Sequence, residues 1–137
     1  MSLLLEEDYE ILKDCGLTYE EDEANRFLVI TNYAAPVGLY ISDGQPVTEV
    51  EVLVIIPQNY NTSGTDMLWT HPAITRTDGG AIPAVMGYGG RDPRHHKGKE
   101  FCRWSRHYNG SSWKAKVDNI EKILGRIEWA LQNPAAT

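Results

Sequence analysis

The sequence has few cysteines, no long hydrophobic run and fewer basic than acidic residues. Cys15 and Cys102 are its only cysteines, too few for a disulfide framework, so we expect free thiols in a reducing compartment. The longest hydrophobic run is Val52–Ile56, far short of the ~20 residues of a membrane span. The first five residues lack the basic region of a secretion signal. A net charge of −6 argues against nonspecific nucleic-acid binding. We therefore expect a cytoplasmic protein with no membrane or nucleic-acid partner.

Two helices are predicted, one near each end of a single domain that spans residues 1–137. Residues 4–14 have a hydrophobic side and are followed by Gly16, which is typical of a helix end. Residues 118–132 form the clearest element, because Asp118 and Glu121 resemble a capping box and Asn133 with Pro134 ends the pattern. Its hydrophobic residues recur every three or four positions and form one stripe: Val117, Ile120, Leu124, Ile127 and Leu131.

The segment between the helices has the pattern of a sheet over about residues 17–75. Arg26–Tyr33 is rich in β-forming residues, and Val47–Pro57 alternates valine with glutamate before it becomes wholly hydrophobic. Met67–Thr70 is a third strand, and the acidic residues 18–23 are a link or a short strand. Arg76–Lys99, rich in glycine, proline and charge, is predicted to be a long loop. The class is α+β: an N-terminal helix, an antiparallel meander of about four strands, a long loop and a C-terminal helix.

The segment Phe101–Trp113 contains most of the candidate catalytic residues, within a candidate active-site region of about residues 76–113. Cys102 is a candidate nucleophile, because a thiolate can accept and then release an acyl group. Arg103 and Arg106 are expected to lower the pKa of its thiol by their positive charge. The alternative is a buried structural thiol, since cysteine is among the most buried residue types.

Other polar residues of this region have competing interpretations. Ser105 can form an oxyester if a base such as His107 takes its proton, or it is an ordinary loop hydroxyl. His107 is a general base or a structural histidine. Asn109 can donate its amide to an oxyanion, although Asn-Gly is also a turn signal, which we favour.

His95 and His96, with Asp92, raise the question of a metal site. Adjacent histidines seldom bind one ion, and the spacing matches no usual zinc pattern. We therefore expect no metal and no cofactor, and we interpret the histidines as part of a basic, solvated loop. A metal-dependent or nucleic-acid-acting protein built on this loop is the weakest of the functional hypotheses.

Four stretches resemble the ubiquitin-conjugating enzyme superfamily, and within it the bacterial family E of conjugating-enzyme-like proteins. They are "VLVIIPQNYN", "DMLWTHPAI", "RWSRHYNGSSW" and "VDNIEKILGRIEWALQNP", and the resemblance covers about residues 26–134. It implies a fold like that of the conjugating enzymes, with Cys102 at the position of the catalytic cysteine. It also implies that His71 and Pro72 form the histidine-proline step, where the histidine braces a loop. Ala73 stands where these enzymes have asparagine, and the gap from His71 to Cys102 is long.

The resemblance implies two partners, a ubiquitin-like protein and its activating enzyme, and two alternative functions. In the first, the chain accepts the C-terminus of the ubiquitin-like protein as a thioester or oxyester and transfers it to an amine. In the second, the same fold binds these partners without catalysis, as the change at Ala73 favours. The string "WSRH" is typical of the bacterial family, which makes Ser105 a second nucleophile candidate behind Cys102. Residues 102–107 are expected to form an irregular segment with outward side chains.

Overall fold

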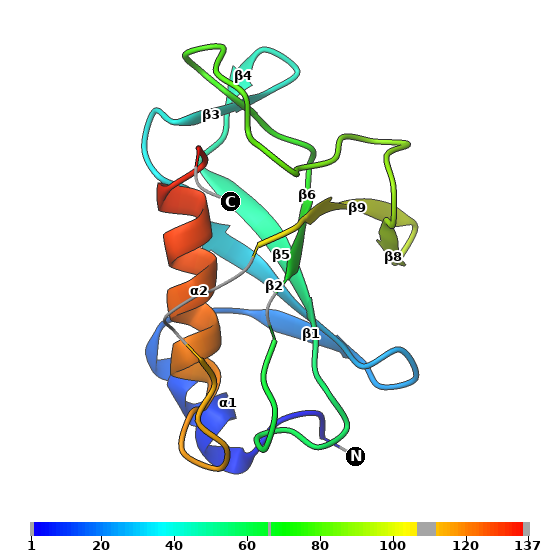
Figure 1. Ribbon diagram of the computed structural model, residues 1–137, viewed down its shortest axis with the longest axis vertical. Coiled ribbons are helices and arrows are strands. Elements are labelled where there is room, and N and C mark those ends of the chain that lie inside the picture. Colours follow the sequence, from blue (N-terminus) through cyan, green and yellow to red (C-terminus); the bar gives the residue numbers. More distant parts are fainter. Residues whose placement is uncertain (1, 66, 107–111, 136–137) are drawn as a thin grey trace.

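The computed structural model describes residues 2–65, 67–106 and 112–135, which form two helices packed against one face of an antiparallel sheet (Figure 1). The helices are α1, Glu6–Asp14, and α2, Ile120–Gln132. The strands are β1 (Tyr19–Asp22), β2 (Phe27–Ala34), β3 (Tyr40–Ser42), β4 (Gln45–Pro46), β5 (Glu49–Ile55), β6 (Leu68–His71), β7 (Thr75–Arg76), β8 (Arg94–His96) and β9 (Lys99–Trp104).

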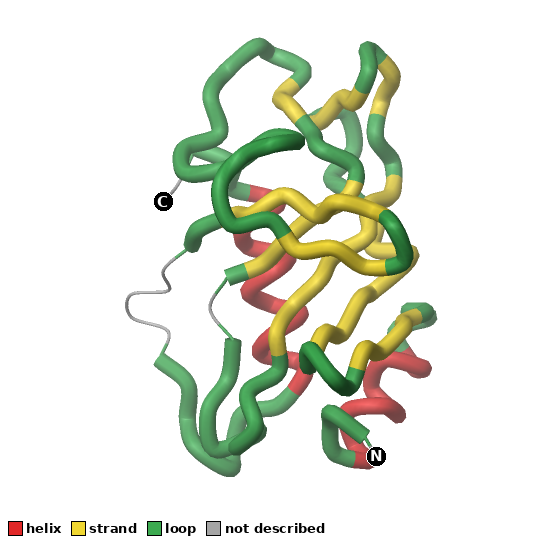
Figure 2. The backbone as a smooth tube through the Cα atoms, turned by 90° about the vertical axis from the view of Figure 1, so that its right-hand side faces the viewer, coloured by secondary structure: helices red, strands yellow, loops and turns green. Residues whose placement is uncertain are grey.

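The main sheet has six strands in the order β1-β2-β5-β6-β9-β8, and every neighbouring pair is antiparallel. Figure 2 shows the strands in front of the two helices. The predicted α+β class, with a helix at each end and an antiparallel sheet, is confirmed. The predicted number of about four strands is wrong for this sheet. The three predicted strands became β2, β5 and β6. Residues 18–23, for which a link or a short strand was expected, contain β1, and the hairpin β8–β9 adds two more strands. A separate sheet of three short strands has the order β4-β3-β7.

Two hydrophobic cores lie on opposite faces of the main sheet, because successive side chains of a strand alternate between its faces. The larger core lies between the sheet and the helices. Its cross-strand pairs include Leu28 with Val54 and Ile30 with Val52, all at most 1% exposed. The smaller core covers the other face and consists of Phe27, Val29, Leu53, Trp69 and Phe101. Burial of each large hydrophobic side chain stabilises the fold by roughly 1.5–3 kcal/mol.

Helix α2 follows the predicted stripe but begins two residues later than predicted. Its N-cap is Asn119, whose side-chain oxygen accepts a hydrogen bond from the Glu121 amide at 2.9 Å. The capping box predicted for Asp118 and Glu121 is therefore wrong. Val117 precedes the helix and is 72% exposed, so it does not belong to the buried stripe. The buried side of the helix consists of Ile120, Ile123, Ile127, Ala130 and Leu131.

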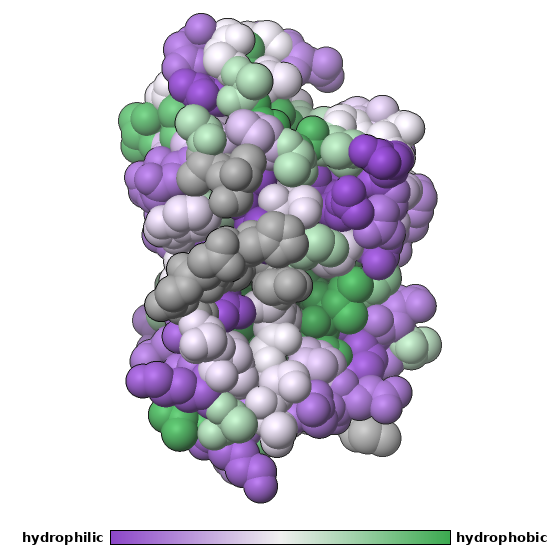
Figure 3. Space-filling view, in the orientation of Figure 1, coloured by the Kyte–Doolittle hydropathy of each residue, from purple (hydrophilic) through white to green (hydrophobic). Residues whose placement is uncertain are grey.

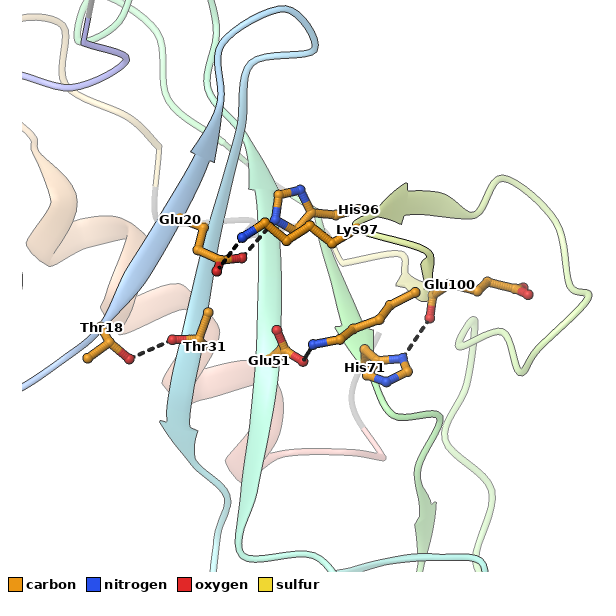
Figure 4. A network of polar contacts seen from close by, with 9 residues as sticks. Thr18, Glu20, Thr31, Glu51, His71, His96, Lys97 and Glu100 are labelled. Atoms are coloured by element: carbon orange, nitrogen blue, oxygen red, sulfur yellow. Dashed lines mark hydrogen bonds and ion pairs between the residues drawn. The ribbon is translucent and has the colours of Figure 1, made fainter.

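On the outer face of the sheet, side chains from the two edge strands, β1 and β8, and from the turn after β8 contact one another (Figure 4). His96 Nε2 of β8 lies 2.9 Å from Glu20 Oε1 of β1, and Lys97 Nζ donates to Glu20 Oε2 at 2.8 Å. Lys99 Nζ donates to Glu51 Oε2 at 2.7 Å. Since β1 and β8 end the strand order, the sheet is curled until its two edges meet. The prediction that residues 76–99 form only a loop is wrong, because their C-terminal part is the β8–β9 hairpin.

The N-termini of both helices meet at Asp8, which is fully buried. Its Oδ2 accepts a hydrogen bond from the Leu5 amide and its Oδ1 one from the Ile120 amide, both at 2.9 Å. A carboxylate is stabilised at a helix N-terminus by the unpaired amides and the helix dipole, and here one carboxylate serves two helices. Burial, and next the charge of Asp8, raise the pKa of Tyr60 nearby.

The surface seen in Figure 3 is mostly hydrophilic, and hydrophobic residues appear on it as separate small patches. Neither α1 nor α2, the two helices of the described ranges, combines the length and hydrophobicity that crossing a bilayer requires.

Candidate functional site

The candidate site lies where β9 ends, and the strand divides its residues between two faces. Cys102 is directly opposite Thr70 of β6, and Arg103 is opposite Trp69. Phe101 and Arg103 therefore lie on the face of the smaller core, whereas Cys102 and Trp104 lie on the face of the larger one. The expectation of an irregular segment is wrong for residues 102–104, which are strand.

Cys102 is a buried thiol in a regular strand. Cys102 is 1% exposed. Trp104, on the same face of the strand, is fully buried, and its Nε1 donates a hydrogen bond to Thr70 Oγ1 at 3.2 Å. Burial, and next the negative charge of Glu100, raise the pKa of the Cys102 thiol from 9.0 to about 11. At neutral pH the group is therefore almost entirely the protonated thiol, which is a poor nucleophile.

The two arginines expected to activate this thiol face other partners. Arg103 Nη1 lies 3.3 Å from Asp92 Oδ2 on the opposite face of the sheet. Arg106 is fully buried; its Nη1 donates to the carbonyl of Pro83 at 2.8 Å, and its guanidinium lies 5.1 Å from the ring centroid of Trp104. The expectation that they lower the pKa of Cys102 is wrong, because burial dominates and raises it.

Ser105 is the first residue beyond β9 and is partly exposed. Its amide donates to the carbonyl of Ala84 at 3.1 Å, and its carbonyl accepts from Arg106 Nη1 at 2.8 Å. Both main-chain groups of Ser105 are thereby held, so its position is set by the fold. Of the nucleophile candidates that the structure describes, Ser105 is the more accessible.

His71 ends β6 on the face opposite to Cys102. Its Nδ1 lies 3.0 Å from the carbonyl oxygen of Glu100 (Figure 4). The centroid of its ring lies 5.6 Å from that of Phe101 and 6.1 Å from that of Tyr88. Tyr88 Oη in turn accepts a hydrogen bond from the Ala73 amide at 3.2 Å. These contacts hold His71 against β9 and Tyr88 and place it away from Cys102, and its role in bracing a loop stays a prediction.

Two predicted site residues, His107 and Asn109, lie outside the described residues. The remaining candidate cluster, His95, His96 and Asp92, is spread over separate contacts: Asp92 pairs with Arg94 and with Arg103, whereas His96 faces Glu20. Within residues 2–65, 67–106 and 112–135, no group of three or more histidine, cysteine, aspartate or glutamate side chains is arranged to hold a metal ion.

Sequence reasoning missed a short extended segment beside the site. The Met86 amide donates to the carbonyl of Arg103 at 2.9 Å, and Val85 forms an antiparallel bridge with Trp104. Pro83 and the glycines around this segment concealed the pairing, since both residue types are typical of loops. The available signal was the absence of any charged residue between Asp78 and Arg91.

Comparison with known families identifies the family of this chain. The sequence model of the family described as prokaryotic E2 family E matches residues 4–134, nearly the whole chain. The chain belongs to this family. Its members are related to the ubiquitin-conjugating enzymes, so the predicted resemblance is confirmed, and the match also covers α1 and β1. No curated protein and no solved structure matches the chain significantly.

The described elements of this E2-like chain are consistent with the fold of the conjugating enzymes: an N-terminal helix, a curled antiparallel sheet and a C-terminal helix. Partners of the E2-like family are, in general, ubiquitin-like proteins and their activating enzymes. Since the family match includes the end of β9 and everything up to Pro134, the candidate site lies within the shared domain.

Proposed function

We propose that this chain is an acyl carrier that accepts the C-terminus of a ubiquitin-like protein from an activating enzyme and transfers it to a target amine. In the first step, a side-chain O–H or S–H of this chain attacks the thioester that joins the ubiquitin-like protein to the activating enzyme. A new ester or thioester forms, and the enzyme's cysteine leaves with the proton. In the second step, the amine attacks this ester, an amide forms, and the side chain recovers its proton. The family match over residues 4–134 is the observation that carries this proposal.

The nucleophile of this proposal lies within residues 102–107, and the geometry favours Ser105 over Cys102. This reverses the order that the sequence suggested. Ser105 is partly exposed at the end of a strand, whereas Cys102 is 1% exposed and its thiol pKa is raised to about 11. A hydroxyl needs a base to take its proton, and His107, two residues along the chain, is the candidate for that role. Asn109 remains a candidate amide donor to the oxyanion, although its Asn-Gly pair favours a turn.

The test is to charge the protein with the activating enzyme and ubiquitin-like protein of its gene neighbourhood, and to follow the adduct on a non-reducing gel. We expect Ser105→Ala to abolish the adduct and Cys102→Ala to retain it. The wild-type adduct should survive excess thiol and break in mild base, as an oxyester does. Cys15→Ser, which changes an exposed thiol, is the matched control for cysteine replacement. Loss of the adduct only in Cys102→Ala, with cleavage by thiol, would assign the site to Cys102 instead.

A second candidate function is a binding module that holds the ubiquitin-like protein or the activating enzyme without a covalent step. The buried, protonated Cys102 favours it, as does Ala73 at the place of the asparagine found in conjugating enzymes. This function predicts a complex with either partner in size-exclusion chromatography. It also predicts no adduct under conditions in which the activating enzyme itself is loaded.

A further inference from the structure

Residues 84–86 pair with the end of β9 directly beside Ser105, through one isolated β-bridge at Val85. The Met86 amide donates to the carbonyl of Arg103 at 2.9 Å, and the Ser105 amide donates to the carbonyl of Ala84 at 3.1 Å. These two hydrogen bonds flank the bridge between Val85 and Trp104. The segment thus lies on the same side of β9 as β8, and it continues that edge of the sheet past the end of the strand.

Val85 turns its own backbone groups away from β9. In an antiparallel pair flanked by hydrogen bonds in this way, the two facing residues direct their N–H and C=O groups outward, away from each other. Those of Trp104 face β6, where Trp104 is opposite Leu68. Those of Val85 face away from β9, and neither takes part in any hydrogen bond within the described residues. Val85 is therefore an unpaired position on the sheet edge.

The composition of this edge is unusual for an exposed strand. No charged residue occurs from Gly79 to Gly90, whereas 23% of the whole chain is charged. Natural proteins usually blunt sheet edges with charge, which prevents another chain from pairing there. The neighbouring edge strand β8 has this protection through Arg94 and His95. The edge at Val85 lacks it, although Ala84 is exposed and Val85 is partly exposed.

We propose that the edge at Val85 binds the extended C-terminal tail of the ubiquitin-like protein as an added β-strand. This proposal rests on the proposed function, in which that C-terminus is joined to a side chain at the end of β9. Adjacent strands lie about 4.8 Å apart, so an added strand at Val85 runs roughly 10 Å from Ser105. A tail that extends about 3.4 Å per residue covers this distance in about three residues.

Backbone pairing suits such a tail for two physical reasons. The N–H and C=O of Val85 offer it hydrogen bonds that do not depend on its side chains, as in other cases of strand addition. An uncharged edge also avoids the cost of covering charged groups that have no partner. The tail would thereby be held on the segment whose Ala84 carbonyl positions Ser105.

Amide hydrogen exchange tests the proposal without altering the protein. We expect hydrogen exchange at the Val85 amide to slow at least tenfold when the covalent adduct with the ubiquitin-like protein forms. The Met86 amide, already bonded to Arg103, is the internal control and should not change. Equal exchange at Val85 in the free and charged protein would overturn the proposal. Protection of the Val85 amide that grows with protein concentration in the absence of the ubiquitin-like protein would also overturn the proposal, because the edge would then bind a second copy of this chain.

A pair of variants provides a functional measurement. Val85→Pro removes the outward N–H but disfavours the positive φ of 57° at Ala84, so it is introduced together with Ala84→Gly. Ala84→Gly alone is the matched control. We expect the double variant to be charged about tenfold more slowly than the control, and equal rates would contradict tail binding at this edge.

Failure of the proposed function can be separated from failure of this inference. If the wild type forms no adduct, the acyl-transfer proposal fails, and the edge is tested by titration with a peptide. The probe is an uncharged six-residue peptide that ends in glycine amide. We expect the amide resonance of Val85 to shift in the wild type and the binding to be lost in the double variant. No shift at Val85 at millimolar peptide would refute the docking edge on its own.

Discussion

Cys102 should be far less reactive than Cys15, and this difference decides whether it can act as a nucleophile. With a pKa of about 11 instead of 9.0, the thiolate fraction of Cys102 at pH 7 is on the order of one in ten thousand, about a hundredfold below that of an ordinary thiol. The residue is also only 1% exposed, so a reagent reaches it only after local opening of the sheet. Cys15 follows α1 and is exposed. We therefore expect Cys15 to react at least a hundredfold faster.

The assay is alkylation with iodoacetamide, followed by mass spectrometry of the intact protein and its peptides. One label should be added to the native chain and two to the chain in urea. Cys15→Ser should resist labelling when folded, and Cys102→Ala should label at the wild-type rate. If Cys102 instead reacts within tenfold of Cys15, the argument from burial is refuted and Cys102 returns as the leading nucleophile.

The same raised pKa predicts how stability depends on pH. Below pH 9 the thiol is neutral in the folded and unfolded chains, so its contribution to stability is complete. As the pH rises from 9 to 11, the unfolded chain ionises first, and this contribution is lost. The free energy of unfolding of the wild type should therefore fall by about 2 kcal/mol relative to that of Cys102→Ala over this range. Urea denaturation at pH 7, 9 and 11 measures this difference, and a constant difference would contradict the prediction.

Two further predictions concern packing and capping. Gly64→Ala should destabilise the fold by about 1–3 kcal/mol, because the added Cβ would lie 2.1 Å from the Trp113 ring. Gly125→Ala in α2 should be neutral or stabilising by up to about 1 kcal/mol, because no atom lies within 4 Å of the added Cβ and alanine favours a helix over glycine. Equal melting temperatures of the two variants would refute this. Asp8→Asn should cost about 1–3 kcal/mol in urea denaturation, because each carboxylate oxygen of Asp8 accepts from a different helix N-terminus and asparagine replaces one of these oxygens with an NH2 donor. An unchanged midpoint would show that the buried carboxylate is dispensable.

Hydrophobic periodicity predicted the elements that face the larger core, and it failed for strands that are polar. The valines of β5 and the isoleucines of α2 repeat with the periods of a strand and a helix, so their elements could be read from the sequence. Strand β1 has the sequence YEED and β8 has RHH, in which no apolar alternation appears. Their pairing depends on contacts between distant segments, such as Glu20 with His96, that no local pattern encodes.

The position of the candidate site along the chain stays a prediction from the sequence, and its geometry could not be predicted from the sequence. Proximity in sequence placed Arg103 and Arg106 beside Cys102, whereas the strand turns Arg103 to the opposite face and Arg106 reaches the carbonyl of Pro83. That outcome depends on β9 being a strand, which in turn depends on its pairing with β6. Tertiary contacts therefore reversed an inference that was reasonable from charge alone.

The end of β9 determines both which residue is accessible and what lies beside it. Pairing with β6 ends at Trp104, opposite Leu68, so Ser105 is the first position whose side chain is released from the sheet. The same residue is held from the other side by the carbonyl of Ala84. A partner that pairs with the open edge at Val85 would therefore fix the segment that positions Ser105. Under the proposed function, binding of a tail and placement of Ser105 are then coupled through a single hydrogen bond, and a substitution at the edge should change the rate of charging without contact with the acyl group.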